Sequence, residues 1–227
     1  MKIKFGSIVT DGRGKLGGQV YARNRSGAYV RNKVTPNNPQ TLYQSLQRAV
    51  LATFSEAWRG LTQQQREAWN AAGESFPTTN QFGDQVIPTG KNLFTRLNNN
   101  LTDISQSTLT NPPLPAPIVE PEDLEADANA DAQTLTLDFN GDNAMGYKIF
   151  ATPPLSPGVG FFKNKFKMIQ TLSTAPPGTI LLTDDYLARF GAFQAGQKIA
   201  IKVVPVVAAT GQKGVGKTVA VIAVDTP

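Results

Sequence analysis

Four of the seven residues from Asn111 to Pro117 are prolines, and no other segment constrains the fold of this 227-residue chain as strongly. Each proline fixes its own φ and moves the preceding residue out of the helical region, so the segment is an extended, semi-rigid connector. Apolar residues recur at helical spacing before it, and short β-prone runs follow it. The sequence therefore predicts two units, residues 1–110 and 118–227, joined by a linker at 111–117.

The unit after the linker has the pattern of an all-β domain. Short runs rich in β-branched and aromatic residues alternate with turn residues, and an acidic run before them is a candidate first strand. The β-prone runs are Gln133–Phe139, Gly146–Ala151, Phe166–Leu172, Thr179–Thr183, Lys198–Ala208 and Thr218–Val224. Six or seven such strands are typical of an immunoglobulin-like or fibronectin type III-like sandwich. Asp184–Phe190 fits one helical turn before the sixth strand.

The unit before the linker combines strands with helices. Residues 16–34 form two β-prone stretches around Asn24–Gly27, which predicts a β-hairpin with its turn at that place. Helical spacing then predicts helices over 40–58, 63–74 and 89–104. The fold class expected for the whole chain is an α+β module, a β-hairpin plus about three helices, followed by the all-β sandwich.

Two details of the expected helices concern the core. Thr62-Gln63-Gln64-Gln65 has the form of a capping box, which predicts the start of the second helix. Trp58 and Trp69 are expected to pack as core aromatics in the angle between the first two helices. The residues expected on the buried side of the second helix are Leu61, Ala68, Trp69 and Ala72. Those expected on the buried stripe of the first helix are Leu42, Leu46, Ala49, Val50, Thr53, Phe54 and Ala57.

Charge is distributed unevenly along the chain, whose net charge is +5. Residues 1–112 hold 13 Lys and Arg against six Asp and Glu, whereas residues 113–227 hold nine against 11. Almost all of the positive excess lies in the first 35 residues, which predicts an electrostatic contact surface there. The candidate docking residues are Arg13, Lys15, Tyr21, Arg23, Arg25, Tyr29, Arg31 and Lys33. Strand alternation in the hairpin predicts that Tyr21 and Tyr29 are exposed aromatics flanked by arginines.

Two kinds of partner fit a hairpin of this composition. Arg and Tyr are enriched at the energetic centres of protein interfaces, which favours docking onto an acidic protein surface. The same cations can neutralise phosphates while tyrosine stacks on bases, so DNA binding stays open as an alternative. Glycan binding by the loops of the sandwich is a further alternative, with Phe161 and Phe162 as its candidate aromatics.

The sequence lacks residue types that many catalytic and metal-binding sites require. It contains no cysteine and no histidine, which removes thiolate nucleophiles, the commonest general base and most zinc ligands. Residues 211–218 match the spacing of a phosphate-binding loop, but the β-prone run after them replaces the helix that such a loop requires. The acidic residues between Glu120 and Asp131 match no calcium loop and form no paired catalytic site. We therefore expect a non-enzymatic protein without cofactor or metal, and no apolar run suits a membrane span.

The N-terminal unit resembles a known group of proteins through a series of short motifs. They are Gly12-x-Gly14-Lys15-x-Gly17-Gly18, Val20-Tyr21-x-Arg23-Asn24-Arg25-x-Gly27-x-Tyr29-Val30-Arg31, Pro36-x-Asn38-Pro39-x-Thr41-x-x-Gln44-x-x-x-Arg48 and Trp58-x-x-Leu61-Thr62-x-x-Gln65-Arg66-x-x-Trp69-Asn70. This series is similar to virion structural proteins of tailed bacteriophages and, more distantly, to a Bacteroidetes family of unknown function. The resemblance covers roughly residues 5–76 and carries no catalytic residues.

The resemblance implies a role in a virus particle. The expected protein is a structural component of the neck, the tail or the capsid surface, assembled in the host cytoplasm and located in the virion. Its expected partners are other virion proteins, namely capsid, portal, neck or tail subunits, together with further copies of itself in a homo-oligomer. The hairpin and helices are then the anchoring module, and the sandwich is displayed or packs against neighbours.

Overall fold

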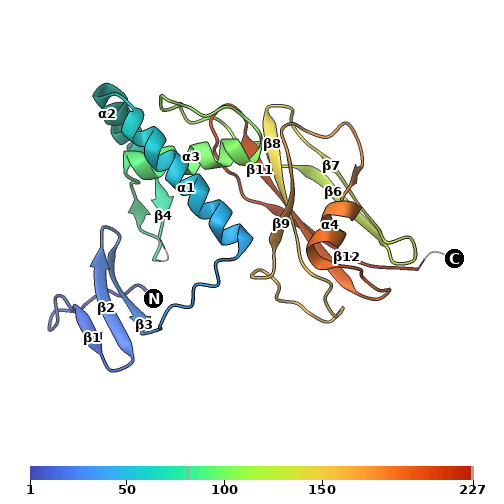
Figure 1. Ribbon diagram of the computed structural model, residues 1–227, viewed down its shortest axis with the longest axis horizontal. Helices are drawn as coiled ribbons and strands as arrows, with labels where there is room; N and C mark the ends of the chain where they lie inside the picture. Colours follow the sequence, from blue (N-terminus) through green and yellow to red (C-terminus); the bar gives the residue numbers. More distant parts are fainter. Residues whose placement is uncertain (81, 226–227) are drawn as a thin grey trace.

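The computed structural model describes residues 1–80 and 82–225, and these form a small sheet, a group of helices and a β-sandwich in chain order (Figure 1). Residues 226 and 227, the end of the unit predicted to span 118–227, lie outside the described residues. The predicted linker at 111–117 contains neither helix nor strand. Three structural parts therefore follow one another where the sequence predicted two units.

The first 33 residues, called the arm from here on, form a three-stranded antiparallel sheet in the order β1-β2-β3. Its strands are β1 (Gly14–Leu16), β2 (Gln19–Asn24) and β3 (Gly27–Asn32). β2 and β3 are the predicted hairpin, and Gly27 at its turn has φ +105°, a value that suits glycine. β1 was not predicted, because the glycines around it hide any alternation of side chains. The first residues add to the sheet, since the Val30 amide donates to the Met1 carbonyl at 2.8 Å.

The helices lie within two residues of the predicted ranges. They are α1 (Leu42–Gly60), α2 (Gln63–Ala72) and α3 (Gly90–Asp103), and a 3-10 turn η1 (Gly73–Ser75) follows α2. The short strands β4 (Thr78–Thr79) and β5 (Gln85–Val86) form a hairpin before α3. The three helices share one core, made of Phe54, Leu61, Trp69, Phe76, Leu93, Phe94 and Leu97.

Phe94 of α3 stands at the centre of this helical core. Its ring lies 5.3 Å from the ring of Trp69, which is buried, and 5.6 Å from that of Trp58, which is half-buried. Both tryptophans therefore pack as core aromatics, as predicted. The Trp69 indole NH donates to the Thr110 carbonyl at 2.9 Å, so the polar end of a fully buried ring is satisfied. Ala68, in contrast, is exposed, because α3 contacts only the Trp69 side of α2.

Most of the apolar stripe predicted for α1 is not covered: Phe54 is buried and Val50 is half-buried, whereas Leu42, Leu46, Ala49, Thr53 and Ala57 are exposed. Leu42 is 72% exposed and Leu46 is 51% exposed. The physical reason is geometric: the helical core meets the carboxyl half of α1, and the amino half extends beyond it towards the sandwich (Figure 1). There Tyr43 contacts the sandwich, because the Arg189 guanidinium lies 3.7 Å from the centre of its ring.

The predicted capping box at the start of α2 is present. The Thr62 hydroxyl accepts from the Gln65 amide at 3.2 Å, and the Gln65 side chain accepts from the Thr62 amide at 2.9 Å. Thr62→Ala is expected to lower the free energy of unfolding by about 1 kcal/mol, because it leaves free amides at the helix start. Urea unfolding followed by tryptophan fluorescence measures the loss. Thr62→Ser keeps the acceptor and is the control; equal losses in both variants would contradict a capping role.

The remaining strands form two antiparallel sheets packed face to face, the sandwich that the sequence predicted. One sheet has the order β10-β7-β6 and the other β12-β11-β8-β9. The strands are β6 (Glu122–Asn129), β7 (Thr134–Asn140), β8 (Met145–Ala151), β9 (Lys167–Leu172), β10 (Ile180–Leu181), β11 (Lys198–Val207) and β12 (Lys217–Ile222). The predicted helical turn is α4 (Thr183–Phe190), and the acidic run before β7 is the first strand, β6.

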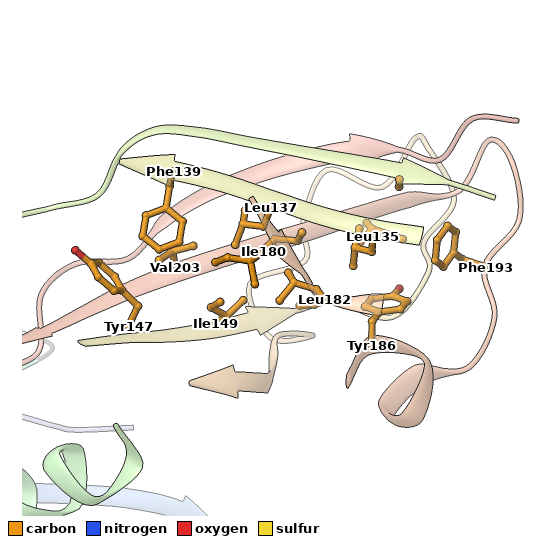
Figure 2. Packing of buried hydrophobic residues seen from close by; sticks show 14 of the residues in the cluster. Leu135, Leu137, Phe139, Tyr147, Ile149, Ile180, Leu182, Tyr186, Phe193 and Val203 are labelled. Carbon is orange, nitrogen blue, oxygen red and sulfur yellow. The ribbon is translucent and has the colours of Figure 1, made fainter. Parts of the chain in front are cut away.

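The core of the sandwich comes from alternate residues of the facing strands. Leu135, Leu137 and Phe139 of β7 point towards Tyr147 and Ile149 of β8 and are all nearly inaccessible to solvent (Figure 2). Tyr186 of α4 closes one end, where its hydroxyl donates to the Thr152 carbonyl at 3.1 Å. Burial raises the pKa of the Tyr186 hydroxyl, so this group stays protonated and keeps its hydrogen bond.

The carboxyl end of α3 docks onto the sandwich, and we call this contact the seam. Lys148 of β8 is 5% exposed, and its ammonium group donates to Asp103 at 2.5 Å and to the Asn100 side-chain oxygen at 2.8 Å. The side-chain amide group of Asn100 donates to the Gly211 carbonyl at 2.8 Å. Ile104 lies against Gly146, where an added Cβ would stand 2.7 Å from its Cδ1. Polar and apolar contacts therefore join the helices to the sandwich.

Candidate docking site on the arm

The structure brings the predicted docking residues together on one small sheet. Lys15 lies in β1, Tyr21 and Arg23 lie in β2, and Tyr29 and Arg31 lie in β3. Arg13 precedes β1, Arg25 occupies the hairpin turn and Lys33 follows β3. All six cations are exposed, whereas the two tyrosines are half-buried rather than the exposed aromatics that alternation predicted.

Strand register divides these residues between the two faces of the sheet. Lys15 pairs with Val20 and Val20 with Arg31, so Lys15 and Arg31 share one face with Tyr29. Tyr21 pairs with Val30 and lies on the opposite face with Arg23. The sequence grouped both tyrosines with the arginines, but cross-strand pairing separates them.

The face of Tyr21 has a mixed charge. The Asp11 carboxylate lies 3.3 Å from Nε of Arg13 and 3.9 Å from Nη1 of Arg23. These exposed ion pairs contribute little to stability, but they hold the guanidinium groups near the edge of the sheet. The Tyr21 hydroxyl donates to the Gln19 side-chain oxygen at 3.0 Å, which fixes the ring against the strand.

An apolar hollow of about 490 Å³ lies on this face of the arm. Phe5, Val9, Leu16 and Tyr21 form its apolar lining, and Arg13 and Lys15 also line it. The Phe5 ring covers Gly12, where an added Cβ would lie 3.0 Å from the ring. Leu16 is 72% exposed, so an anchor-sized apolar surface remains open to a partner.

The sequence reasoning missed Phe5, Val9 and Leu16, and one signal could have found the first of them. Lys2-Ile3-Lys4-Phe5 alternates charged and apolar residues with the period of a strand. The Ile3 amide indeed donates to the Ala28 carbonyl at 3.0 Å, so this segment extends the sheet and carries Phe5 to the hollow.

The arm is joined to the rest of the chain loosely. Residues 34–41 are exposed and contain no strand or helix (Figure 1). The arm touches the β4–β5 hairpin through Lys4, whose ammonium group lies 3.4 Å from Asp84 and 5.5 Å from the centre of the Phe82 ring. The side chains of Lys4 and Asp84 are at least half exposed and Phe82 is 46% exposed, so the contact is worth little free energy.

The phosphate-loop pattern at 211–218 does not form a phosphate cradle. The Gln212 amide donates to the Thr210 hydroxyl at 3.3 Å and the Gly214 amide to the Pro205 carbonyl at 2.9 Å. These amides are turned inward, and the strand β12 begins at Lys217 where a phosphate loop needs a helix. The segment is the turn between β11 and β12, as the sequence analysis favoured.

The other candidate features have structural explanations. The acidic residues from Glu120 to Asp131 lie on and around β6, and across residues 1–80 and 82–225 no three His, Cys, Asp or Glu side chains are placed to hold a metal ion. Phe162 is half-buried and packs edge-on against Phe166 with ring centres 5.8 Å apart, whereas Phe161 is 69% exposed.

None of the described helices combines the length and the apolar character of a membrane span.

Comparison with known proteins finds similar solved structures for about half of the chain. No protein-family model and no curated protein matches the chain. A crystal structure of an Fn3-like protein from Clostridium thermocellum matches 49% of this chain and 99% of its own, with 16% identity and a TM-score of 0.32. The fn3 domain of human collagen alpha-1(XX) chain matches 50% of this chain and 91% of its own, with 16% identity and a TM-score of 0.33.

A third similar structure is a beta-1,2-glucanase from Parabacteroides distasonis, which is 18% identical and has a TM-score of 0.28. The match covers 50% of this chain but only 15% of the glucanase. All three TM-scores are below 0.5, and the strand order of the sandwich itself defines its fold. That order, three strands facing four, is the arrangement of immunoglobulin-like domains.

Proposed function

We propose that this protein is a non-enzymatic structural component of a tailed-phage virion, present in many copies and held there by protein–protein docking of its arm. The observation that carries the proposal is the hollow on the arm, an open and mostly apolar surface with Arg13 and Lys15 in its lining. A small sheet on an exposed connector has little reason to carry such a surface unless a partner covers it.

The chemistry of the hollow favours a protein partner with an acidic rim. Leu16 and Tyr21 offer apolar area in the lining of the hollow, and Arg13 and Lys15 of the same lining offer positively charged donors. Interfaces gain most of their affinity from such buried apolar and aromatic anchors, and charge complementarity at the rim adds specificity and rate.

The motif resemblance supports the same assignment. Its conserved-looking Gly, Arg and Asn-Pro positions fall in the arm, in the connector and in the first two helices. In this proposal residues 1–110 are the basic anchoring module, an α+β unit that meets the particle. The sandwich, residues 118–227, is displayed or packs against neighbouring subunits. Many symmetric copies would then strengthen a modest contact through avidity.

The proposal predicts that Leu16→Asp prevents incorporation of the chain into particles. A charge in the hollow opposes burial of the anchor, so the amount of chain per particle is expected to fall at least about tenfold. Quantitative mass spectrometry of gradient-purified particles, made by the virus that encodes the chain, measures this ratio. Arg31→Glu alters the opposite face of the arm and is the matched control for the sheet.

Two outcomes would contradict this assignment. Absence of the wild-type chain from purified particles would exclude a virion component. Equal incorporation of the wild type and Leu16→Asp would exclude the hollow as the docking site. Circular dichroism of the purified variants verifies that both still fold, since the arm contributes no residue to the helical core or the sandwich core.

DNA binding is the second candidate, and the opposite face of the arm favours it. Strand register places Lys15 and Arg31 on that face, although Lys15 in the edge strand also borders the hollow. Asp11 forms its two ion pairs with Arg13 and Arg23 and none with Lys15 or Arg31 among the described residues. DNA binding predicts a steep linear fall of log affinity with log salt and a strong loss in Arg31→Glu. Docking through the hollow predicts that Leu16→Asp has the larger effect, so the same pair of variants separates the two functions.

A further inference from the structure

A second cavity, of about 410 Å³, lies beside the seam, between the helices and the sandwich. α3 contributes Arg96, Leu97 and Asn100 to its wall, and the turn between β11 and β12 contributes Lys213. Phe76 from the end of η1 and Ile118 from the segment before β6 complete the apolar part. Its size falls in the range of small-molecule sites.

The charged residues that line this cavity are positive. Arg96 and Lys213 both line it, and within the described residues its lining contains no Asp or Glu. Arg96 is half-buried, and burial lowers the pKa of its guanidinium group. Its guanidinium group makes one long polar contact within residues 1–80 and 82–225, 3.5 Å from Nη2 to the Phe76 carbonyl. Among these residues its other donors have no partner, so they can bind a ligand.

The wall that carries Lys213 is fixed before any ligand arrives. The Gln212 side-chain oxygen accepts from the Ala116 amide at 2.7 Å and from the Thr210 hydroxyl at 3.1 Å. On the other side, Asn100 is held by Lys148 and by the Gly211 carbonyl. A preformed polar wall binds a ligand without the entropic cost of ordering a loop.

The rest of the lining is apolar. Phe76 and Leu97 are buried members of the helical core, and Ile118 is partly exposed at the mouth. A ligand that satisfies the whole cavity therefore has a negatively charged head for Arg96 and Lys213 and a compact apolar body for Phe76 and Ile118.

We propose that this cavity binds a small organic anion, with a carboxylate or phosphate head between Arg96 and Lys213. The site lies outside the arm and does not depend on the docking function. Because its walls come from α3 and from the sandwich, a bound anion also stabilises the seam, by adding binding free energy to the joined form alone.

Benzoate and phenyl phosphate are suitable probes, because they combine the same apolar ring with the two anionic heads. In a nitrogen-15 NMR titration of the full chain, at least one of them is expected to shift the Lys213 amide and the Arg96 side-chain NH signals saturably. The neutral analogue benzamide is expected to bind at least about tenfold more weakly, because it lacks the charge that both cations recognise. Comparison of the two anions identifies the preferred head.

Lys213→Gln is the decisive variant, because Lys213 is exposed and its loss leaves the core intact. Both Lys213→Gln and Arg96→Gln are expected to weaken binding about tenfold, whereas Lys163→Gln, an exposed lysine outside the lining, leaves it unchanged. The proposal is overturned if neither anion gives a saturable shift at these residues, or if the shifts persist equally in Lys213→Gln. Shifts caused by hexaglutamate and by neither small anion would also overturn it, in favour of a peptide site.

Discussion

Asp103→Ala is expected to lower the free energy of unfolding by about 3 kcal/mol, because it leaves the Lys148 charge in the seam without a counter-charge. The Lys148 side chain is 6% exposed and that of Asp103 is 23% exposed, so the ammonium group depends on Asp103 far more than the reverse. Removal of one partner of a buried pair costs more than the pair itself contributes. Urea unfolding followed by tryptophan fluorescence measures the loss, since Trp58 and Trp69 both lie in the helical core.

Lys148→Met is the matched variant, because it keeps the length of the side chain and removes the buried charge. The Asp103 carboxylate that remains can be hydrated, so the expected loss is only about 1 kcal/mol, mostly from the unpaired Asn100 oxygen. The double variant should resemble Lys148→Met, which gives a coupling energy of about 3 kcal/mol between the two residues. Additive losses in the double variant would show that the pair does not interact.

The pH dependence of Asp103→Ala provides an independent check. Burial lowers the pKa of Lys148 from 10.5, and its hydrogen bond to Asp103 and the charge of that residue oppose the change. Without Asp103 the folded-state pKa falls further, so below 10.5 the unfolded chain binds more protons and stability rises with pH. The deficit of the variant relative to the wild type is therefore expected to shrink as the pH rises through the lowered folded-state pKa towards 10.5.

Local patterns in the sequence predicted most of the elements well. The hairpin at Gln19–Asn32, the capping box at Thr62 and the strands of the sandwich all follow from residues that are neighbours in the chain. Such signals are strong because turn residues and apolar periodicity act within a few positions. α1 is correct to within two residues at each end for the same reason.

Features that depend on distant residues could not be predicted. The part of the α1 stripe that is buried depends on where Phe94 of α3 packs against α1. Nothing near Leu42 or Leu46 in the sequence indicates that the helical core does not reach them. The separation of Tyr21 from Tyr29 depends on strand register, which a one-residue shift would reverse. The seam was not predicted, because the sequence around a buried lysine such as Lys148 does not distinguish it from a solvent-exposed lysine.

Gly211→Ala is the second substitution with a large expected effect, about 3 kcal/mol or more. Gly211 has φ +73°, and an added Cβ would overlap the Leu97 carbonyl of α3 and lie 3.0 Å from the Leu101 side chain. The left-handed backbone costs a residue with Cβ about 1–2 kcal/mol, and overlap with helix backbone cannot be relieved by a rotamer change. The variant is therefore expected to force α3 away from the sandwich.

Two other glycines separate strain from overlap in this experiment. Gly196 has φ +77° but open space around its Cα, so Gly196→Ala should show the backbone cost alone, about 1 kcal/mol. Gly158 has neither feature, and Gly158→Ala should be close to neutral. Hydrogen exchange locates the effect: Gly211→Ala should increase exchange at the carboxyl end of α3 and leave the amides of β7 and β8 protected. A Gly211→Ala loss no greater than that of Gly196→Ala would mean that the two parts of the chain are not held in contact at this glycine.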